Sequence, residues 1–150
     1  MEYRYIDTGK TSRKRKHDDV TVGKSFAQLY SGAFRLFARI STPCAKDLFF
    51  WAIEKCDKWN HIAFNKAGRS AFIAEHFIAS GHRYADETVK KAVKVLTDEG
   101  LCVSISEESK RSATYMINPY YVWKTKSRTD RYEVVKAYIN ILKDEGNQIR

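Results

Sequence analysis

The chain reads ADETVKKAVKVLTDEGLCVSI from residue 85 to residue 105, and this segment carries the clearest structural pattern in the sequence. Its first part repeats apolar residues at helical spacing, which predicts a helix of about Ala85–Glu99. The residues expected on its buried side are Val89, Ala92, Val93 and Leu96. Gly100 follows where a helix usually ends. Leu101, Val103 and Ile105 then alternate with smaller residues, as in a strand with one buried face.

Further strands and a helix are predicted on both sides of this segment. Before it, the pattern predicts a short strand at His61–Asn65, a helix of about Gly68–Ala79 and a turn at Ser80–His82. The expected inner side of that helix consists of Phe72, Ile73, His76 and Phe77. After it, a polar turn at Glu107–Arg111 leads into a return strand at Ala113–Ile117. The order strand, helix, turn, helix and hairpin is that of a winged helix-turn-helix domain, in which the hairpin is the wing.

Three more helices are expected around this unit. The helix at Ser25–Ile40, which allows a short extended entry, has an apolar face of Phe26, Leu29, Tyr30, Ala33, Phe34 and Phe37. Thr42 followed by Pro43 is a helix start signal, and the apolar face of Pro43–Asp57 is too wide for a surface helix. The last helix, about Thr129–Asp144, carries one apolar stripe of Val135, Tyr138, Ile139 and Leu142, widened by Val134 and Ile141.

Together these elements predict a mainly α fold with a small β-hairpin. A winged helix-turn-helix domain is expected over residues 23–126, with extra N- and C-terminal helices. A basic arm over residues 1–22 precedes it, and a C-terminal helix over residues 127–150 follows it. The helix Pro43–Asp57 is expected in the core or at a dimer interface. Because this helix and the C-terminal one have wider apolar faces than one small domain needs, we expect a homodimer, with the C-terminal helix as a dimerisation element.

The charge of the chain indicates a polyanionic partner. The formal net charge is +9 and the pI is about 9.5, which favours nucleic acid or an acidic membrane surface. The longest apolar stretch, Leu48–Ile53, is too short to span a bilayer, and residues 1–16 lack the apolar core of a signal peptide. We therefore expect a cytoplasmic protein whose partner is double-stranded DNA rather than a membrane.

Residue patterns for catalysis or metal binding are missing from the sequence. The three cysteines, Cys44, Cys56 and Cys102, are odd in number and widely spaced, so reduced core thiols are expected rather than disulfides or a zinc site. The four histidines contain no His-x-His pair, and His76 is interpreted as a core histidine. Gly23-Lys24-Ser25 lacks the first glycine of a phosphate-binding loop. We expect no enzymatic activity, no metal and no cofactor.

Helical spacing places Glu87, Lys90, Lys91 and Lys94 on the side of the helix that faces away from the core. A basic face on the second helix is what phosphate binding requires, although a solvated lysine face is the plainer alternative. The predicted DNA contacts are Arg83, Tyr84, Thr88, Lys90, Lys91 and Lys94 around the helix, Lys110 and Arg111 at the wing, and Arg13, Lys14, Arg15 and Lys16 in the arm. For the arm, a solvated tail is an equal alternative.

Two acidic residues, Asp86 and Glu87, occupy the first turn of the same helix, where side chains that read bases usually lie. Negative charge there stabilises the helix dipole, so both residues have a structural explanation. Either carboxylate can also accept a hydrogen bond from the amino group of cytosine. Since both repel phosphate, the expected contacts shift toward Arg83, Tyr84 and the lysines.

One family resemblance adds to this picture. Tyr115-Met116-Ile117-Asn118-Pro119-Tyr120-Tyr121-Val122-Trp123-Lys124 resembles the end of the wing in RepL-type plasmid and phage replication proteins. Tyr5–Gly9 and Phe26–Tyr30 also follow that family's layout. The resemblance implies a winged helix that binds the origin of its own replicon. The segment from Gly81 to Thr88 is longer than in the common pattern, and the acidic pair departs from it as well.

Three functions remain open at this point. The first is sequence-specific binding of an origin for plasmid or phage replication, with host replication proteins as further partners. The second is transcriptional regulation by a repressor of the same fold, because both functions use the same DNA-binding surface. The third is a protein-interaction module without DNA binding, which the acidic Asp86 and Glu87 favour.

Overall fold

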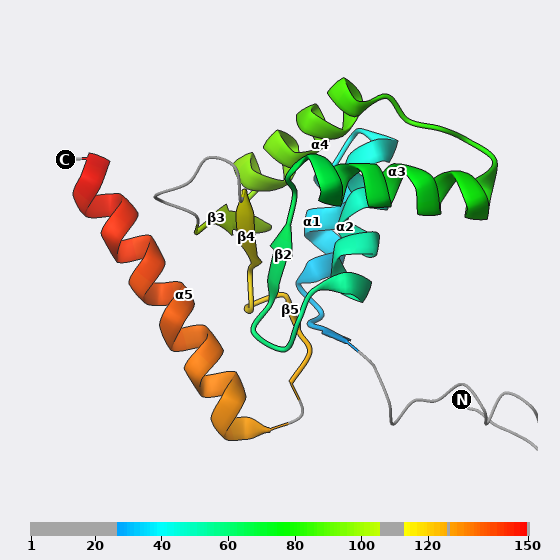
Figure 1. Ribbon diagram of the computed structural model, residues 1–150. Coiled ribbons are helices and arrows are strands. Elements are labelled where there is room, and N and C mark those ends of the chain that lie inside the picture. The colour runs from blue at the N-terminus through cyan, green and yellow to red at the C-terminus, as the bar shows by residue number, and fades with distance from the viewer. Residues whose placement is uncertain (1–26, 106–112, 126, 150) are drawn as a thin grey trace, which may run out of the picture.

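The computed structural model describes residues 27–105, 113–125 and 127–149 of the chain. These residues are mainly helical, with a small antiparallel sheet (Figure 1). The helices are α1 (Ala33–Arg39), α2 (Pro43–Lys55), α3 (Lys66–Ser80), α4 (Asp86–Asp98) and α5 (Arg128–Ile149). The strands are β1 (Gln28–Leu29), β2 (His61–Ala63), β3 (Cys102–Ser104), β4 (Thr114–Ile117) and β5 (Val122–Trp123).

The main sheet has the strand order β2-β4-β3, and both strand pairs are antiparallel. Met116 in the central strand lies opposite His61 on one side and Val103 on the other. Since β2 comes just before α3 and β3 just after α4, this sheet joins the two ends of the α3–α4 pair. The predicted order of strand, helix, turn, helix and returning strand is therefore present.

Helix α2 lies at the centre of the main core. Its residues Ala45, Leu48, Phe49 and Ala52 are all buried, and the helix packs against α4. Most of the wide apolar face predicted for this helix thus serves the core of its own chain, whereas Phe50 is 52% exposed. All three cysteines are buried free thiols, as expected, and burial raises the pKa of Cys56 and of Cys102 to about 11.

Both faces of the sheet are covered, which corrects the prediction of a single buried face for the strand after α4. Cys102 and Ile117 face the main core formed with α1–α4. Val103 and Met116 face α5 and pack with Val134 and other residues of that helix. Figure 1 shows α5 running along the side of the sheet opposite to α1–α4. The sequence around β3 predicted only one buried face, because the helix that covers the other face, α5, lies far along the chain.

The predicted first helix is shorter than expected. Residues Gln28–Leu29 pair with Val122–Trp123 of β5, so the chain becomes helical only at Ala33. The short helix α1 then buries Ala33 and Leu36, whereas Phe34, which was predicted on the apolar face, is 75% exposed. The pairing with β5 therefore displaces the start of the helix and changes which aromatic residues are covered.

Residues at the helix ends explain where α2 and α3 begin and where α3 ends. Helix α2 begins at Pro43, as predicted. Helix α3 begins at Lys66, two residues before the predicted start, because the Asn65 side chain caps it by accepting a hydrogen bond from the Gly68 N–H at 2.8 Å. Gly81 ends α3 with a φ of 82°, the left-handed conformation that glycine adopts without strain.

Candidate nucleic-acid interface

Helix α4 turns one side to the core and the other to solvent. Its buried residues are Val89, Ala92, Val93 and Leu96, as the spacing predicted. Thr88, Lys90, Lys91 and Lys94 are exposed, again as predicted. We call the solvent side of this helix the α4 face; it consists of Glu87, Thr88, Lys90, Lys91, Lys94 and Asp98 together with the partly exposed Asp86.

The lysines of the α4 face are balanced by acidic residues. Helix α4 contains three lysines and three acidic residues, so its side chains carry no net charge. Lys90 Nζ lies 3.2 Å from Glu87 Oε2, and Lys94 Nζ lies 3.0 Å from Asp98 Oδ2. Lys91 has no ion pair within the described part of the chain. It is therefore the lysine of this helix that can meet a phosphate without first leaving a carboxylate.

The two acids at the start of α4 have different surroundings. Asp86 accepts a hydrogen bond from Arg69 Nε at 2.8 Å, and the Arg69 guanidinium also donates to the Phe64 carbonyl. The hydrogen bond from Arg69 holds the pKa of Asp86 below its ordinary value. Glu87 is exposed and pairs only with Lys90 among the described residues. Asp86 thus ties α4 to α3, and Glu87 is the acidic group that remains directed at solvent.

Arg83 and Tyr84, which precede α4, also differ: one is exposed to solvent and the other is held within the fold. Arg83 is exposed, with its guanidinium 4.3 Å from the centre of the Phe77 ring. Phe77 was predicted on the inner side of α3 and is instead 39% exposed beneath this arginine. Tyr84 packs between α3 and α2, and its hydroxyl donates to Asp47 Oδ2 at 2.7 Å. Burial, together with this bond to a carboxylate, raises the pKa of Tyr84.

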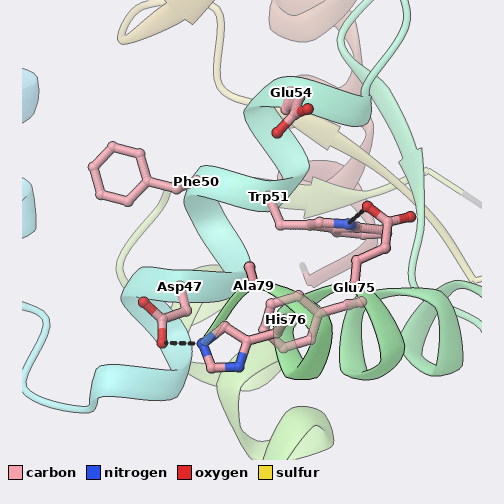
Figure 2. A pocket seen from close by; sticks show the side chains of 8 residues that line it. Asp47, Phe50, Trp51, Glu54, Glu75, His76 and Ala79 are labelled. Carbon is pink, nitrogen blue, oxygen red and sulfur yellow. Dashed lines mark hydrogen bonds and ion pairs between the residues drawn. The ribbon is translucent and has the colours of Figure 1, made fainter. Parts of the chain in front are cut away.

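His76 links three parts of the fold. Its Nε2 lies 3.1 Å from Asp47 Oδ2 on α2, as Figure 2 shows, and its Nδ1 lies 3.1 Å from the carbonyl oxygen of His82 in the α3–α4 turn. The Tyr84 ring lies against the imidazole at 4.7 Å between centroids. His76 therefore acts as a packed structural residue, as the sequence suggested, and it fixes the turn that precedes α4.

Ser80 completes a serine, histidine and aspartate cluster that needs a chemical interpretation. Its Oγ lies 3.2 Å from His76 Nδ1 but donates to the His76 carbonyl oxygen at 2.8 Å, and it accepts from the His82 N–H. Since the hydroxyl proton is directed at a carbonyl, the imidazole does not activate the serine as a general base would. The cluster closes the end of α3.

Four basic residues follow the predicted hairpin, and two of them are used within the fold; the four are Lys124, Lys126, Arg128 and Arg131. Lys124 Nζ donates to the carbonyls of Glu54 and Cys56 at the end of α2, at 2.8 and 3.1 Å. The Arg131 guanidinium lies over the Trp123 ring at 4.3 Å. These two cations hold elements together rather than forming an open phosphate track.

Six predicted contact residues lie outside the described residues. They are Arg13, Lys14, Arg15 and Lys16 of the arm and Lys110 and Arg111 of the expected wing. Within the described residues, no group of three or more His, Cys, Asp or Glu side chains could hold a metal ion. No helix in the described ranges is long and apolar enough to cross a membrane.

Arg69 and Asp47 are the residues of this region that sequence reasoning did not assign. Arg69 and Asp47 each contact a residue far along the chain, Asp86 and Tyr84 respectively, and no local pattern announces such contacts. Comparison of the chain with protein-family models, with curated proteins and with solved structures found no match.

Proposed function

We propose that the chain binds double-stranded DNA as a winged helix-turn-helix protein, with α4 as the helix that enters the major groove. The observation that carries this proposal is the α4 face, a solvent-exposed helix side with three lysines opposite four buried apolar residues. The sheet order β2-β4-β3, which places the β3–β4 pair directly after α4, supports it. The expected wing at residues 107–111 lies outside the described residues.

Within this proposal, the contacts have different strengths. Lys91 and the exposed Arg83 meet phosphates directly. Lys90 and Lys94 contribute to phosphate binding only after their ion pairs with Glu87 and Asp98 are replaced by contacts with phosphate oxygens. Tyr84 supports the turn through Asp47 rather than through the DNA. Much of the electrostatic attraction then comes from the basic arm, because α4 itself is neutral overall.

For the biological role we propose control of plasmid or phage replication at an origin, in the cytoplasm and with host replication proteins as partners. The resemblance of residues 115–124 to the RepL-type wing ending supports it. A winged-helix transcriptional repressor is the alternative, because it uses the same surface. Selection of bound fragments from the parent replicon or genome separates the two: an origin repeat supports replication control, and a promoter site supports repression.

The test of DNA binding compares Lys91→Ala with Lys143→Ala. Both variants remove one exposed lysine, but Lys143 lies on α5, away from the α4 face. Lys91→Ala is expected to weaken binding and to reduce the slope of log K against log salt by about one unit, the loss of one phosphate contact. The slope of Lys143→Ala is expected to match the wild type. Affinities are measured by fluorescence anisotropy over a salt series.

A protein-interaction module is the second candidate, and the neutral charge of α4 favours it. It predicts no DNA binding even at low salt, where phosphate contacts are strongest. Absence of binding to any duplex under those conditions would reject both DNA-binding roles.

We also propose that the chain forms a homodimer through α5. Most apolar residues of α2 are used in the core, although Phe50 is 52% exposed. Helix α5 has a second stripe that the described residues leave partly uncovered. This stripe, the outer α5 stripe, consists of Tyr132, Val135, Ile139 and Leu142. Its alternating spacings of three and four are those of a two-helix seam. A two-fold dimer would read half-sites about one helical turn apart.

A further inference from the structure

Helices α2 and α3 line an open pocket that the DNA-binding proposal does not use. Its volume is about 350 Å³, within the range of small-molecule sites. Its walls combine four rings with three carboxylates (Figure 2). The rings belong to Phe50, Trp51, Phe72 and His76, and the carboxylates to Asp47, Glu54 and Glu75.

The main aromatic wall is held in place. The Trp51 Nε1–H donates to Glu75 Oε1 at 3.1 Å, and the indole meets the buried Phe72 ring edge to face at 5.6 Å between centroids. Glu75 is fixed in turn by Lys55 Nζ at 3.1 Å. The partly exposed indole therefore presents a fixed surface to the pocket, with little conformational freedom to lose when a ligand binds.

The charge of the pocket is opposite to that of the whole chain. Asp47 is engaged by Tyr84 and His76, and Glu75 by Lys55. The Glu54 carboxylate is exposed and forms no ion pair with any described residue. A chain with a net charge of +9 thus places a carboxylate that has no ion pair among the described residues beside a partly exposed indole.

We propose that this pocket binds a small organic cation with an apolar body, such as a quaternary ammonium or a protonated amine. The negative faces of aromatic rings attract cations, and tryptophan does so most strongly. Glu54 supplies the balancing charge. An anion is disfavoured by the three carboxylates, and a neutral ligand of the same shape gains neither interaction. The site lies on α2 and α3 and contains no residue of the α4 face.

Choline and its neutral isostere 3,3-dimethylbutan-1-ol test the proposal with the intact chain. The indole N–H signal of Trp51 in a two-dimensional ¹H–¹⁵N spectrum reports on the pocket, and a Trp51→Phe variant assigns it. Choline is expected to shift this signal saturably at millimolar concentration. The alcohol is expected to bind at least about fivefold more weakly than choline, because it lacks the positive charge.

Two variants locate the interaction. Glu54→Gln removes the free carboxylate and is expected to raise the dissociation constant of choline roughly threefold or more. Glu133→Gln, an exposed change on α5, is the matched control and is expected to leave it unchanged. Equal affinity for choline and the alcohol would show that the pocket binds the apolar body without recognising the charge, and would overturn the proposal. So would the absence of any Trp51 shift with choline, or equal binding by the Glu54→Gln variant.

Discussion

Asp86 and Glu87 are neighbours of the same chemical type at the start of α4, yet they have different roles. The Arg69 guanidinium binds Asp86, and Arg69 is only 14% exposed. Glu87 is exposed beside Lys90. Sequence reasoning treated the two acids alike because both stabilise the helix N-terminus. Only the position of α3 against α4 separates them, so under the proposed DNA binding Glu87 is the acid of this turn that is free to approach a base.

The pKa of Asp86 makes a prediction about acid stability. Arg69 holds this pKa below its ordinary value, so the ion pair stabilises the fold above the pKa of the unfolded chain, and that stability is lost as the pH falls through the folded pKa. At pH 7, Asp86→Asn is expected to destabilise the protein by about 1–2 kcal/mol. Below about pH 4 the difference from the wild type is expected to shrink.

Thermal unfolding of both proteins from pH 7 to pH 3 checks this expectation. Glu87→Gln is the matched control, because Glu87 is exposed and lacks the arginine contact. A stability gap between wild type and Asp86→Asn that stays constant over the whole pH range would show that the ion pair does not titrate as described.

At the scale of elements, the long and periodic ones were predictable. Helices α2, α3 and α4 follow from apolar spacing and end signals, and they position the exposed lysines of the α4 face correctly. Strand β5 was not predicted, and β1 was anticipated only as a short extended entry to the first helix. Each contains two residues, too few for any period, and their pairing joins Leu29 with Val122 across most of the chain.

The surroundings of Tyr84 were unpredictable for a similar reason. Its hydroxyl binds Asp47 on α2, and its ring contacts His76 on α3. An aromatic residue just before a helix with exposed lysines suggests a DNA contact in the sequence. The direction of its side chain could not be predicted, because that direction depends on how the three helices pack. The lysines needed no such knowledge, since a helix with one buried side exposes the other side.

Asn60 shows how one residue joins two elements, and it supplies a prediction at this scale. It is fully buried with a φ of 66°, and its side-chain amide donates to the Ile117 and Val122 carbonyls at 3.0 and 2.8 Å. Asn60→Ala is expected to cost about 2–4 kcal/mol, because it leaves two buried acceptors unpaired and places alanine in a left-handed conformation.

Urea unfolding of three variants separates the two contributions. Asn60→Gly keeps the backbone conformation accessible and is expected to lose less stability than Asn60→Ala. Asn140→Ala, an exposed change on α5, is the control and is expected to be near neutral. If Asn60→Ala unfolds at the wild-type urea concentration, then the bonds to β4 and β5 contribute nothing to the fold.

At the scale of the whole molecule, α5 stands apart from the other helices. It packs against the sheet face opposite to α1–α4, through Val134, Tyr138 and Ile141 (Figure 1). The outer α5 stripe lies on a different side of the helix, because its residues are displaced from these positions by about a third of a turn. One side of α5 therefore completes the monomer, and the other is available to a second copy.

The last prediction concerns the proposed homodimer. Ile139→Glu places a charge within the outer α5 stripe, where a partner helix would bury it without a counter-charge, so the protein is expected to become monomeric. Asn140→Glu adds the same charge one residue later, on the exposed side of the helix, and is expected to remain dimeric. Sedimentation at micromolar concentration measures both masses, and circular dichroism checks that the helical content is retained. A monomeric wild type, or a dimeric Ile139→Glu variant, would contradict the α5 interface. It would leave the DNA-binding proposal to stand on the α4 face alone, with a single half-site instead of a palindrome as the expected target.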